Sequence, residues 1–337
     1  MMKQTTIKDI AKLAGVSYAS VSRALNNKGH VSPKTREKIL QICESQGYRT
    51  NILARNLIRK KTNVIGLVIP DASNPFYAEI ALHIEIYMRK MGYNTMLCST
   101  LNEEKTMEEL FDFLLGQRVD GIILASSQDY AVKYAKDCPL VLLGSSFYEE
   151  DIKHLNIVSS DTISGGSIVA EYLLSLGHKK ITYIGHRPGS ITHKNRLEGF
   201  ARTLKRHGLD FTLIENSKSS SSIDSGYALG REFFQKKLSH TAIFAATDST
   251  ALGLLKAADE FHLKIPEDIS LIGYDNIVYS SLPMIELTTI DQRKENLAGE
   301  SAKLLLELLQ NPKTECYTRR LIKPMLLERK SCRLCEA

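Results

Sequence analysis

The 337-residue sequence has no tryptophan, and no apolar run in it approaches the roughly 20 residues that a membrane-spanning helix needs. Its N-terminal residues are polar and basic and lack the apolar core of a secretion signal, so we expect a cytoplasmic protein with no membrane association. The cysteines are scattered, which is typical of reduced thiols rather than of a disulfide framework. They stand at positions 43, 98, 138, 316, 332 and 335.

Cys332 and Cys335 have the one cysteine spacing that metal sites use. A structural zinc site needs four ligands, and no second pair of cysteines or histidines accompanies these two. We therefore predict no metal site, and we expect a loose tail over residues 331–337.

The motifs of common catalytic sites are missing as well. The sequence has no GxxxxGK[ST] phosphate loop, GxGxxG turn, HExxH helix or GxSxG elbow. We therefore predict no catalytic residues and no cofactor. Three classes of protein function remain: a ligand-controlled DNA-binding repressor, a solute-binding protein and an enzyme on a doubly wound fold. The absent secretion signal and the N-terminal head described next argue against the second class, and the absent motifs argue against the third.

The N-terminal residues have the pattern of short helices joined by tight turns. Apolar residues recur with helical spacing over 7–14, and Gly15 suits the turn that follows. The pattern of residues 17–26 predicts a second helix with Ser17 as its cap. Ser32 is the expected cap of a third helix. Two helices joined by a short glycine-containing turn predict a helix-turn-helix DNA-binding head.

Basic charge is concentrated in this head. Residues 1–61 contain 13 lysines and arginines against three acids, a net charge of +10. The whole chain carries +6, so residues 62–337 carry −4. Because neutralising DNA phosphates releases counterions and strengthens binding, this asymmetry favours a double-stranded DNA partner.

The outward face of the second helix is expected to enter the major groove. Arg23 can pair with the edge of a guanine, and Asn26 can bond a base edge or a phosphate. For the serines, a capping or phosphate role is as plausible as base reading. The candidate DNA contacts of the head are Thr6, Ser17, Tyr18, Ala19, Ser20, Ser22, Arg23 and Asn26.

A series of sequence blocks, in one order over nearly the whole chain, resembles the lactose/galactose-repressor (LacI/GalR) family of bacterial transcription regulators. The first block reads TIKDIAKLAGVSYASVSRALN. The blocks are residues 6–26, 31–39, 47–48, 51–57, 65–67, 74–77, 118–121, 196–200, 270–275 and 287–290. The resemblance implies a homodimeric repressor on a pseudo-palindromic operator, with base reading by Tyr18, Ala19 and Arg23.

Residues 50–61 follow the head as a hinge or linker. Residues 51–58 would form only about two helical turns, and so short a helix is marginal in water by itself. The resemblance implies that two copies fold in the DNA minor groove, where Ala54 allows close approach and Leu57 wedges between base pairs. Asn51 is a further candidate DNA contact of this segment. The alternative is a flexible linker in which Leu57 packs on its own domain.

From residue 64 onward, short apolar runs alternate with helix-length segments. This alternation predicts an α/β sensor with parallel sheets covered on both faces, and about ten strands suggest two lobes. The expected strands are 64–69, 95–98, 121–125, 140–143, 157–159, 181–184, 241–245 and 270–274. The expected helices are 75–91, 103–115, 163–176, 193–207, 223–236, 248–261 and 294–310.

The resemblance implies the type I periplasmic-binding-protein architecture for this sensor. The chain then divides into a head (1–49), a hinge (50–61), an effector-binding and dimerisation domain (62–330) and a tail (331–337). The N-lobe would hold about 62–160 and 291–319, and the C-lobe about 161–290 and 320–330. The tetramer-forming members of the family that this chain resembles carry a leucine-heptad tail, which the tail here lacks, so the resemblance implies a dimer rather than a tetramer.

A small-molecule effector is expected in the cleft between the lobes. Phe76 and Tyr77 suit an aromatic platform, and Arg196 and Asp275 suit bidentate hydrogen bonds. Asp248 suits a helix cap or a ligand contact equally well. The weaker candidates are Asp161, which can also be a helix cap, Asp291 and Gln292.

Ser221 departs from the family pattern, because relatives commonly place an aromatic residue at the matching position. Without that aromatic residue, we expect either a ligand that stacks on one side only or a more polar effector. Two acids, one arginine and two aromatic rings favour a sugar or related polyol as effector, and hence a repressor of a carbohydrate-utilisation operon. A nucleobase, a nucleoside or a protein corepressor is the alternative.

Overall fold

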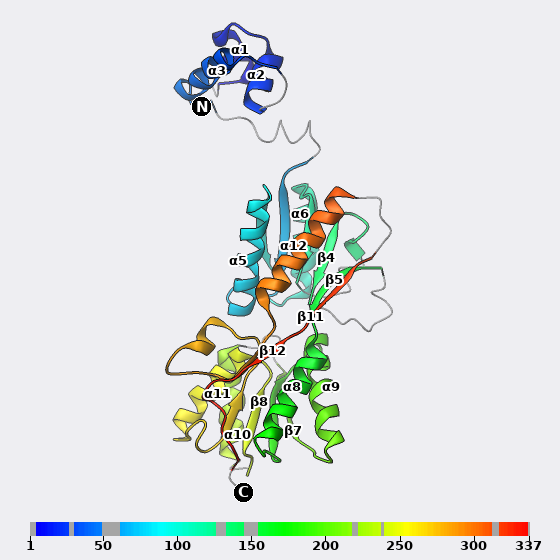
Figure 1. Cartoon of the computed structure of the whole chain (residues 1–337), viewed down its shortest axis with the longest axis vertical. Coiled ribbons are helices and arrows are strands. Elements are labelled where there is room, and N and C mark those ends of the chain that lie inside the picture. The colour runs from blue at the N-terminus through cyan, green and yellow to red at the C-terminus, as the bar shows by residue number, and fades with distance from the viewer. Residues whose placement is uncertain are drawn as a thin grey trace. The chain divides into compact units, whose positions relative to one another are not determined.

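The computed structural model describes residues 5–26, 30–48, 61–125, 133–144, 154–217, 222–236, 239–311 and 317–335. The chain separates into two compact units, Met1–Thr62 and Asn63–Ala337 (Figure 1). The candidates Asn51, Ala54, Leu57 and Ser221 lie outside the described residues, as does the side chain of Asn26.

The head consists of three helices, α1 (Ile7–Ala14), α2 (Tyr18–Asn26) and α3 (Pro33–Ser45). Its helices begin where the sequence supplies caps: the hydroxyl of Ser17 accepts from the backbone N–H of Ser20 at 3.1 Å, and Ser32 caps α3. The three helices enclose a small apolar core formed by Ile10, Ala11, Ala14, Val21, Ala24, Ile39 and Cys43.

The first lobe of the sensor contains a six-stranded parallel sheet in the order β11-β5-β4-β3-β1-β2. The strands are β1 (Val64–Ile69), β2 (Asn94–Ser99), β3 (Gly121–Leu124), β4 (Leu140–Leu143), β5 (Asn156–Ser160) and β11 (Arg319–Ile322). Helices α5 (Pro75–Lys90) and α12 (Lys294–Gln310) lie side by side on one face, and α6 (Glu104–Gly116) covers the other (Figure 1).

The second lobe contains a four-stranded parallel sheet in the order β7-β6-β8-β9. The strands are β6 (Ile181–His186), β7 (Thr212–Glu215), β8 (Ala242–Ala245) and β9 (Ser270–Ile272). One face packs against α8 (Thr162–Ser175) and α9 (Ile191–Arg206), the other against α10 (Ile223–Gln235) and α11 (Asp248–Glu260). A short 3₁₀ helix, η2 (Val278–Ser281), follows β9, and β10 (Thr289–Asp291) pairs antiparallel with β12 (Met325–Leu327).

The strands and helices expected from the sequence coincide with the observed elements to within a few residues. Strand β7 was not expected. It lies at the edge of its sheet and alternates between half-buried and exposed residues, so it lacks the continuous apolar run that marks the buried strands.

The lobe boundary near the C-terminus lies later than expected. Strand β11 pairs with β5 of the first lobe through Ile322, whereas the resemblance placed residues 320–330 in the second lobe. The chain returns to the second lobe at β12, which pairs with β10. The backbone pairing of β11 with β5 therefore corrects this boundary by three residues.

The prediction of a loose tail is wrong as far as Cys335. The backbone N–H of Leu271 donates to the carbonyl of Ser331 at 2.8 Å, and that of Cys335 donates to the carbonyl of Leu176 at 2.8 Å. His178 Nε2 lies 3.0 Å from the carbonyl oxygen of Arg333. Because β9 is an edge strand, the segment after β12 satisfies backbone groups that would otherwise be unpaired.

Within the described residues, no helix is both long enough and apolar enough to cross a bilayer. The same residues include no group of three or more His, Cys, Asp and Glu side chains placed to hold a metal ion.

Candidate functional site

The outward face of α2 carries the side chains expected to read DNA. Tyr18, Ala19 and Arg23 are exposed, whereas Val21 and Ala24 are buried against α1 and α3. Ser20 and Ser22 are partly buried. The helix therefore presents one polar face away from the head's core, as a recognition helix requires.

Two of the head candidates serve as helix caps. The Thr6 hydroxyl accepts from the backbone N–H of Asp9 at 3.3 Å, and the Asp9 carboxylate accepts from the backbone N–H of Thr6 at 2.9 Å, which forms a capping box on α1. Ser17 caps α2 through the contact with Ser20. Both residues remain exposed, so capping and a phosphate contact are compatible.

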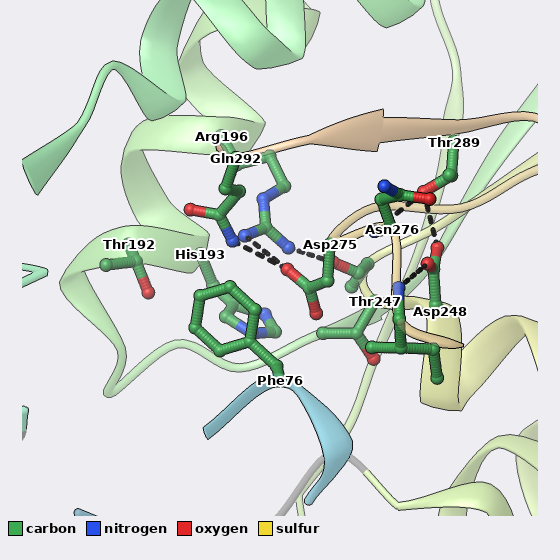
Figure 2. Close-up of polar contacts among 12 residues, drawn as sticks. Phe76, Thr192, His193, Arg196, Thr247, Asp248, Asp275, Asn276, Thr289 and Gln292 are labelled. Atoms are coloured by element: carbon green, nitrogen blue, oxygen red, sulfur yellow. Dashed lines mark hydrogen bonds and ion pairs between the residues drawn. The ribbon is translucent and has the colours of Figure 1, made fainter. Parts of the chain in front are cut away.

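In the sensor, the structure brings together three of the expected effector residues. Gln292 Nε2 donates to Asp275 Oδ1 at 2.6 Å, and Arg196 Nη2 lies 3.8 Å from the same oxygen (Figure 2). All three side chains are more than nine-tenths buried. They come from α9, the loop after β9 and the residue after β10, so the site forms only when the second lobe folds.

Helix packing fixes the position of Arg196. Its guanidinium carbon lies 3.4 Å from the centroid of the Tyr274 ring, a cation–π contact, and its Nη1 donates to the carbonyl of Ala246. Helices α8 and α9 touch at glycines: a Cβ added to Gly166 would lie 2.0 Å from the carbonyl oxygen of Arg196. Only glycine permits this backbone approach, which leaves Arg196 little room to shift.

The backbone at Asp275 and Asn276 has positive φ values of 120° and 51°. Lys294 Nζ, from the start of α12, donates to the carbonyl of Asp275 at 2.9 Å and also to that of Asn276. Burial raises the pKa of Asp275 to about 7, although the Arg196 charge works in the opposite direction. The carboxyl therefore titrates near neutral pH.

Asp248 has a structural role. Its side chain is fully buried and accepts from the backbone N–H of Ile277 at 3.0 Å and from the hydroxyls of Ser280 and Thr289 at 2.6 and 2.5 Å. Thr247, not Asp248, caps α11. The effector contact and the cap considered for Asp248 are therefore both corrected, because its oxygens already hold η2 and β10 against α11.

Asp161 caps α8. Its Oδ1 accepts from the backbone N–H of Ser164 at 3.0 Å and its Oδ2 from the Ser164 hydroxyl at 2.6 Å. Of the two roles that the sequence left open, the structure shows the cap. Asp291 likewise accepts from the backbone N–H of Arg293 at 2.7 Å.

The first lobe contributes aromatic rings. Phe76 and Tyr77 lie in the first turn of α5, which Asn74 caps, and their rings meet edge to face with centroids 5.2 Å apart. Burial raises the pKa of Tyr77 to about 12, with further effects from Asp275 and Arg187 of the second lobe. The Tyr77 hydroxyl therefore lies within electrostatic reach of the second lobe's charged groups.

The two lobes touch beside these residues. Glu79 of α5 accepts from the backbone N–H of Val278 at 3.1 Å, and its carboxylate lies 3.4 Å from Lys294 Nζ. Lys294 in turn donates to the Asp275 carbonyl of the second lobe, so the Glu79–Lys294 ion pair of the first lobe adjoins the candidate effector residues.

Sequence reasoning missed Tyr274, Lys294, Glu79 and His193. His193 stands one helical turn before Arg196, and that spacing could have drawn attention to it. Lys294 and Glu79 carry no comparable signal, because charged residues at helix starts are common and usually solvated.

Comparisons with known proteins agree with both units. A sequence profile of "Bacterial regulatory proteins, lacI family" matches residues 6–51, and one of a "Periplasmic binding protein-like domain" matches residues 170–332. The HTH-type transcriptional regulator DegA of Bacillus subtilis is 35% identical over 88% of this chain and 89% of its own length. This chain belongs to the lacI family of bacterial regulatory proteins.

Other members of the lacI family are similarly related. Catabolite control protein A of Priestia megaterium is 34% identical, covering 90% of this chain and 92% of that protein. The HTH-type transcriptional repressor PurR of Pasteurella multocida is 32% identical over 97% and 98% of the two chains.

Solved structures of lacI-family regulators share the fold. The lac repressor dimer bound to operator and an anti-inducer has a TM-score of 0.86 at 28% identity, covering 98% of this chain and 99% of that one. A lacI-family regulator of Enterococcus faecium with bound ribose has a TM-score of 0.71 at 29% identity, covering 81% and 100%. The architecture is therefore a helix-turn-helix head followed by a two-lobed periplasmic-binding-protein-like sensor.

Proposed function

We propose that this protein is a homodimeric transcriptional repressor that binds a pseudo-palindromic operator and responds to a sugar or sugar derivative held between its lobes. The observation that carries the proposal is the presence of two sites in one lacI-family chain. An exposed recognition helix lies within residues 1–61, whose net charge is +10, and a buried Arg196–Asp275–Gln292 group lies in the sensor. A solute-binding protein or an enzyme would have no use for the first site.

Two-fold symmetry supports the dimer. A single recognition helix contacts few base pairs, so two heads on a palindromic site double the number of contacts. The lac repressor, which has the same fold, is a dimer in its operator complex. We expect the same assembly for this chain.

The chemistry of the sensor residues supports a polyhydroxylated effector. A carboxylate accepts hydrogen bonds from hydroxyl groups, a guanidinium donates hydrogen bonds in a planar fork, and an aromatic ring covers the apolar face of a sugar. Structural relatives contain bound ribose and, in the regulator CelR, cellobiose. These ligands are known for the relatives, and they guide the choice of ligands to test here.

Effector and DNA would act on one equilibrium between two arrangements of the lobes, each ligand favouring the arrangement that it binds more tightly. The hinge would transmit that choice, with Ala54 and Leu57 in the minor groove. Replacing Leu57 by alanine is then expected to weaken operator binding strongly while leaving effector affinity unchanged.

The test begins with enrichment of randomised duplex DNA on the purified protein, followed by fluorescence anisotropy with the selected duplex. Arg23→Ala is expected to relax base preference and to weaken binding by about 1–3 kcal/mol. A panel of sugars, sugar phosphates and nucleosides is then added to the complex. Absence of any enriched sequence would contradict the DNA-reading role, and unchanged operator affinity for Leu57→Ala would contradict the hinge role alone.

A further inference from the structure

A group of unneutralised donors lies beside Arg196 in the second lobe. It consists of Arg187, His193 and the first turn of α9, and we call it the cationic corner. Arg187 is in the loop after β6, and α9 begins at Ile191. None of these groups is needed to explain recognition of a neutral sugar by Arg196 and Asp275.

The N-terminus of α9 has free backbone donors. Its N-cap, Ser190, makes no side-chain hydrogen bond to the helix backbone, because its hydroxyl lies 3.0 Å from the hydroxyl of Thr192 instead. The first turn contains no acidic residue. The first N–H groups of a helix and its dipole together favour an anion at this end.

His193 adds a buried donor with a defined tautomer. Its side chain is only 5% exposed, and its Nδ1 accepts from the backbone N–H of Arg187 at 3.3 Å. Burial, together with the nearby charges of Arg196, Arg187 and His186, holds its pKa well below the usual value, so the ring is neutral. The proton therefore resides on Nε2, which has no hydrogen-bond partner among the described residues.

Arg187 supplies a charge that no acid neutralises. Its guanidinium is partly buried, and it forms no ion pair or hydrogen bond with any residue that the structure describes. Burial lowers its pKa, and only Tyr77 of the first lobe opposes that effect. Arg196, in contrast, has Asp275 beside it. A partly desolvated cation without a partner is costly, and an anionic ligand would offset that cost.

We propose that the effector carries an anionic group, a phosphate or a carboxylate, which binds Arg187, His193 Nε2–H and the first N–H groups of α9. Its hydroxyls then meet Arg196 and Asp275, while Phe76 covers it from the first lobe. Figure 2 draws Phe76 of the first lobe in one view with His193, Arg196 and Asp275 of the second lobe. This inference rests on the proposed function, and it narrows the effector from sugars in general to acidic or phosphorylated ones.

The first test uses inorganic phosphate on the full chain at constant ionic strength, with thermal unfolding as the readout. Raising phosphate from about 1 to about 100 mM is expected to raise the Tm of the parent protein, since a ligand that binds only the folded state stabilises it. Arg187→Ala and His193→Gln are expected to lose most of that increase. The matched control is Arg206→Ala at the other end of α9, where Arg206 pairs with Glu171 at 3.8 Å on the surface. It is expected to keep the full increase.

The second test compares D-ribose 5-phosphate, D-gluconate and D-ribose by calorimetric titration, which separates the phosphate and carboxylate forms of the proposal. Arg187→Ala is expected to weaken an anionic ligand by at least about tenfold and to leave D-ribose unaffected. Equal phosphate-dependent Tm increases in the parent, Arg187→Ala and His193→Gln proteins would overturn the cationic corner. Tighter binding of D-ribose than of either acid would also overturn it.

Failure of the cationic corner is distinguishable from failure of the proposed function. If an acid binds through Arg187 but leaves operator affinity unchanged, the anion site stands and its regulatory role fails. If a neutral sugar binds independently of Arg187 and changes operator affinity, the regulator stands and the anion site fails.

Discussion

The two lobes of the sensor have related folds but contribute different chemistry to the site. The first lobe supplies the rings of Phe76 and Tyr77, whereas the second supplies the buried polar groups Arg196, Asp275 and Gln292. Polar groups that are buried before any ligand arrives need a rigid frame, since an unsatisfied one is costly. Under the proposed function, effector recognition would be built into the second lobe, and the first lobe would cover the effector.

Glycine contacts provide that frame in the second lobe. A Cβ on Gly199 would lie 1.9 Å from the carbonyl of Ile163, and one on Gly253 would lie 2.2 Å from the carbonyl of Ile223. Both helix pairs of this lobe therefore pack backbone against backbone. In the first lobe, α12 has open space around Gly299 and packs through larger side chains such as Leu297 and Leu305.

The largest expected effect comes from Asp248→Ala. The substitution leaves the N–H of Ile277 and the hydroxyls of Ser280 and Thr289 without their buried acceptor, so we expect a loss of about 3–5 kcal/mol in the free energy of unfolding. Urea unfolding measures it. A loss below about 1 kcal/mol would show that this carboxylate does not hold the second lobe together.

Gly166→Ala is expected to have the next largest effect. The added methyl group would meet the carbonyl of Arg196, and overpacking against backbone costs about 1–3 kcal/mol. Gly299→Ala of α12 is the matched control, and we expect it to be neutral or stabilising by up to about 1 kcal/mol. Equal effects of the two substitutions in urea unfolding would remove the proposed difference between the lobes.

The pH dependence of stability tests the buried charge of the second lobe. Because the pKa of Asp275 is about 7 in the folded chain and 3.8 ordinarily, the folded state holds this proton more tightly. Its stabilising contribution is complete below about pH 4 and disappears as the pH rises through 7. Asp275→Asn stays neutral, so its stability relative to the parent should rise between pH 5 and pH 8 by about 1–3 kcal/mol. The same difference in unfolding free energy between Asp275→Asn and the parent at pH 5 and at pH 8 would contradict this prediction.

The smallest effect is expected at the contact between the lobes. Glu79→Gln weakens the pair with Lys294 and the bond to Val278, and we expect about 0.5–1 kcal/mol of destabilisation because Glu79 is partly exposed. Glu85→Gln, which breaks an exposed pair with Arg89 on the same helix, is the control and should change little. The unfolding free energies of both variants give the comparison, and a larger loss for Glu85→Gln would contradict it.

Much of the fold could be predicted from the sequence, because each signal was local. Caps at Ser17 and Ser32, a turn at Gly15 and continuous apolar runs gave the helices and strands. The edge strand β7 could not be predicted, since its half-exposed residues resemble a loop.

The candidate site was predictable only in part, because its residues come from elements far apart in the chain. The sequence pointed to Arg196 and Asp275 but could not show that Asp248, equally acidic, has its oxygens occupied by Ser280 and Thr289. Nor could it show that Lys294, at the start of a first-lobe helix, holds the Asp275 backbone. Whether these residues come together depends on where the chain passes from one lobe to the other, which the sequence does not show.

The most direct test of the account is operator affinity measured by fluorescence anisotropy with and without the identified effector, for the parent protein and for Arg196→Leu. We predict that the effector changes the operator affinity of the parent several-fold, as coupling of roughly 1–3 kcal/mol would give, and leaves that of Arg196→Leu unchanged. If the effector changes both proteins equally, the polar group of the second lobe is not the site that controls DNA binding.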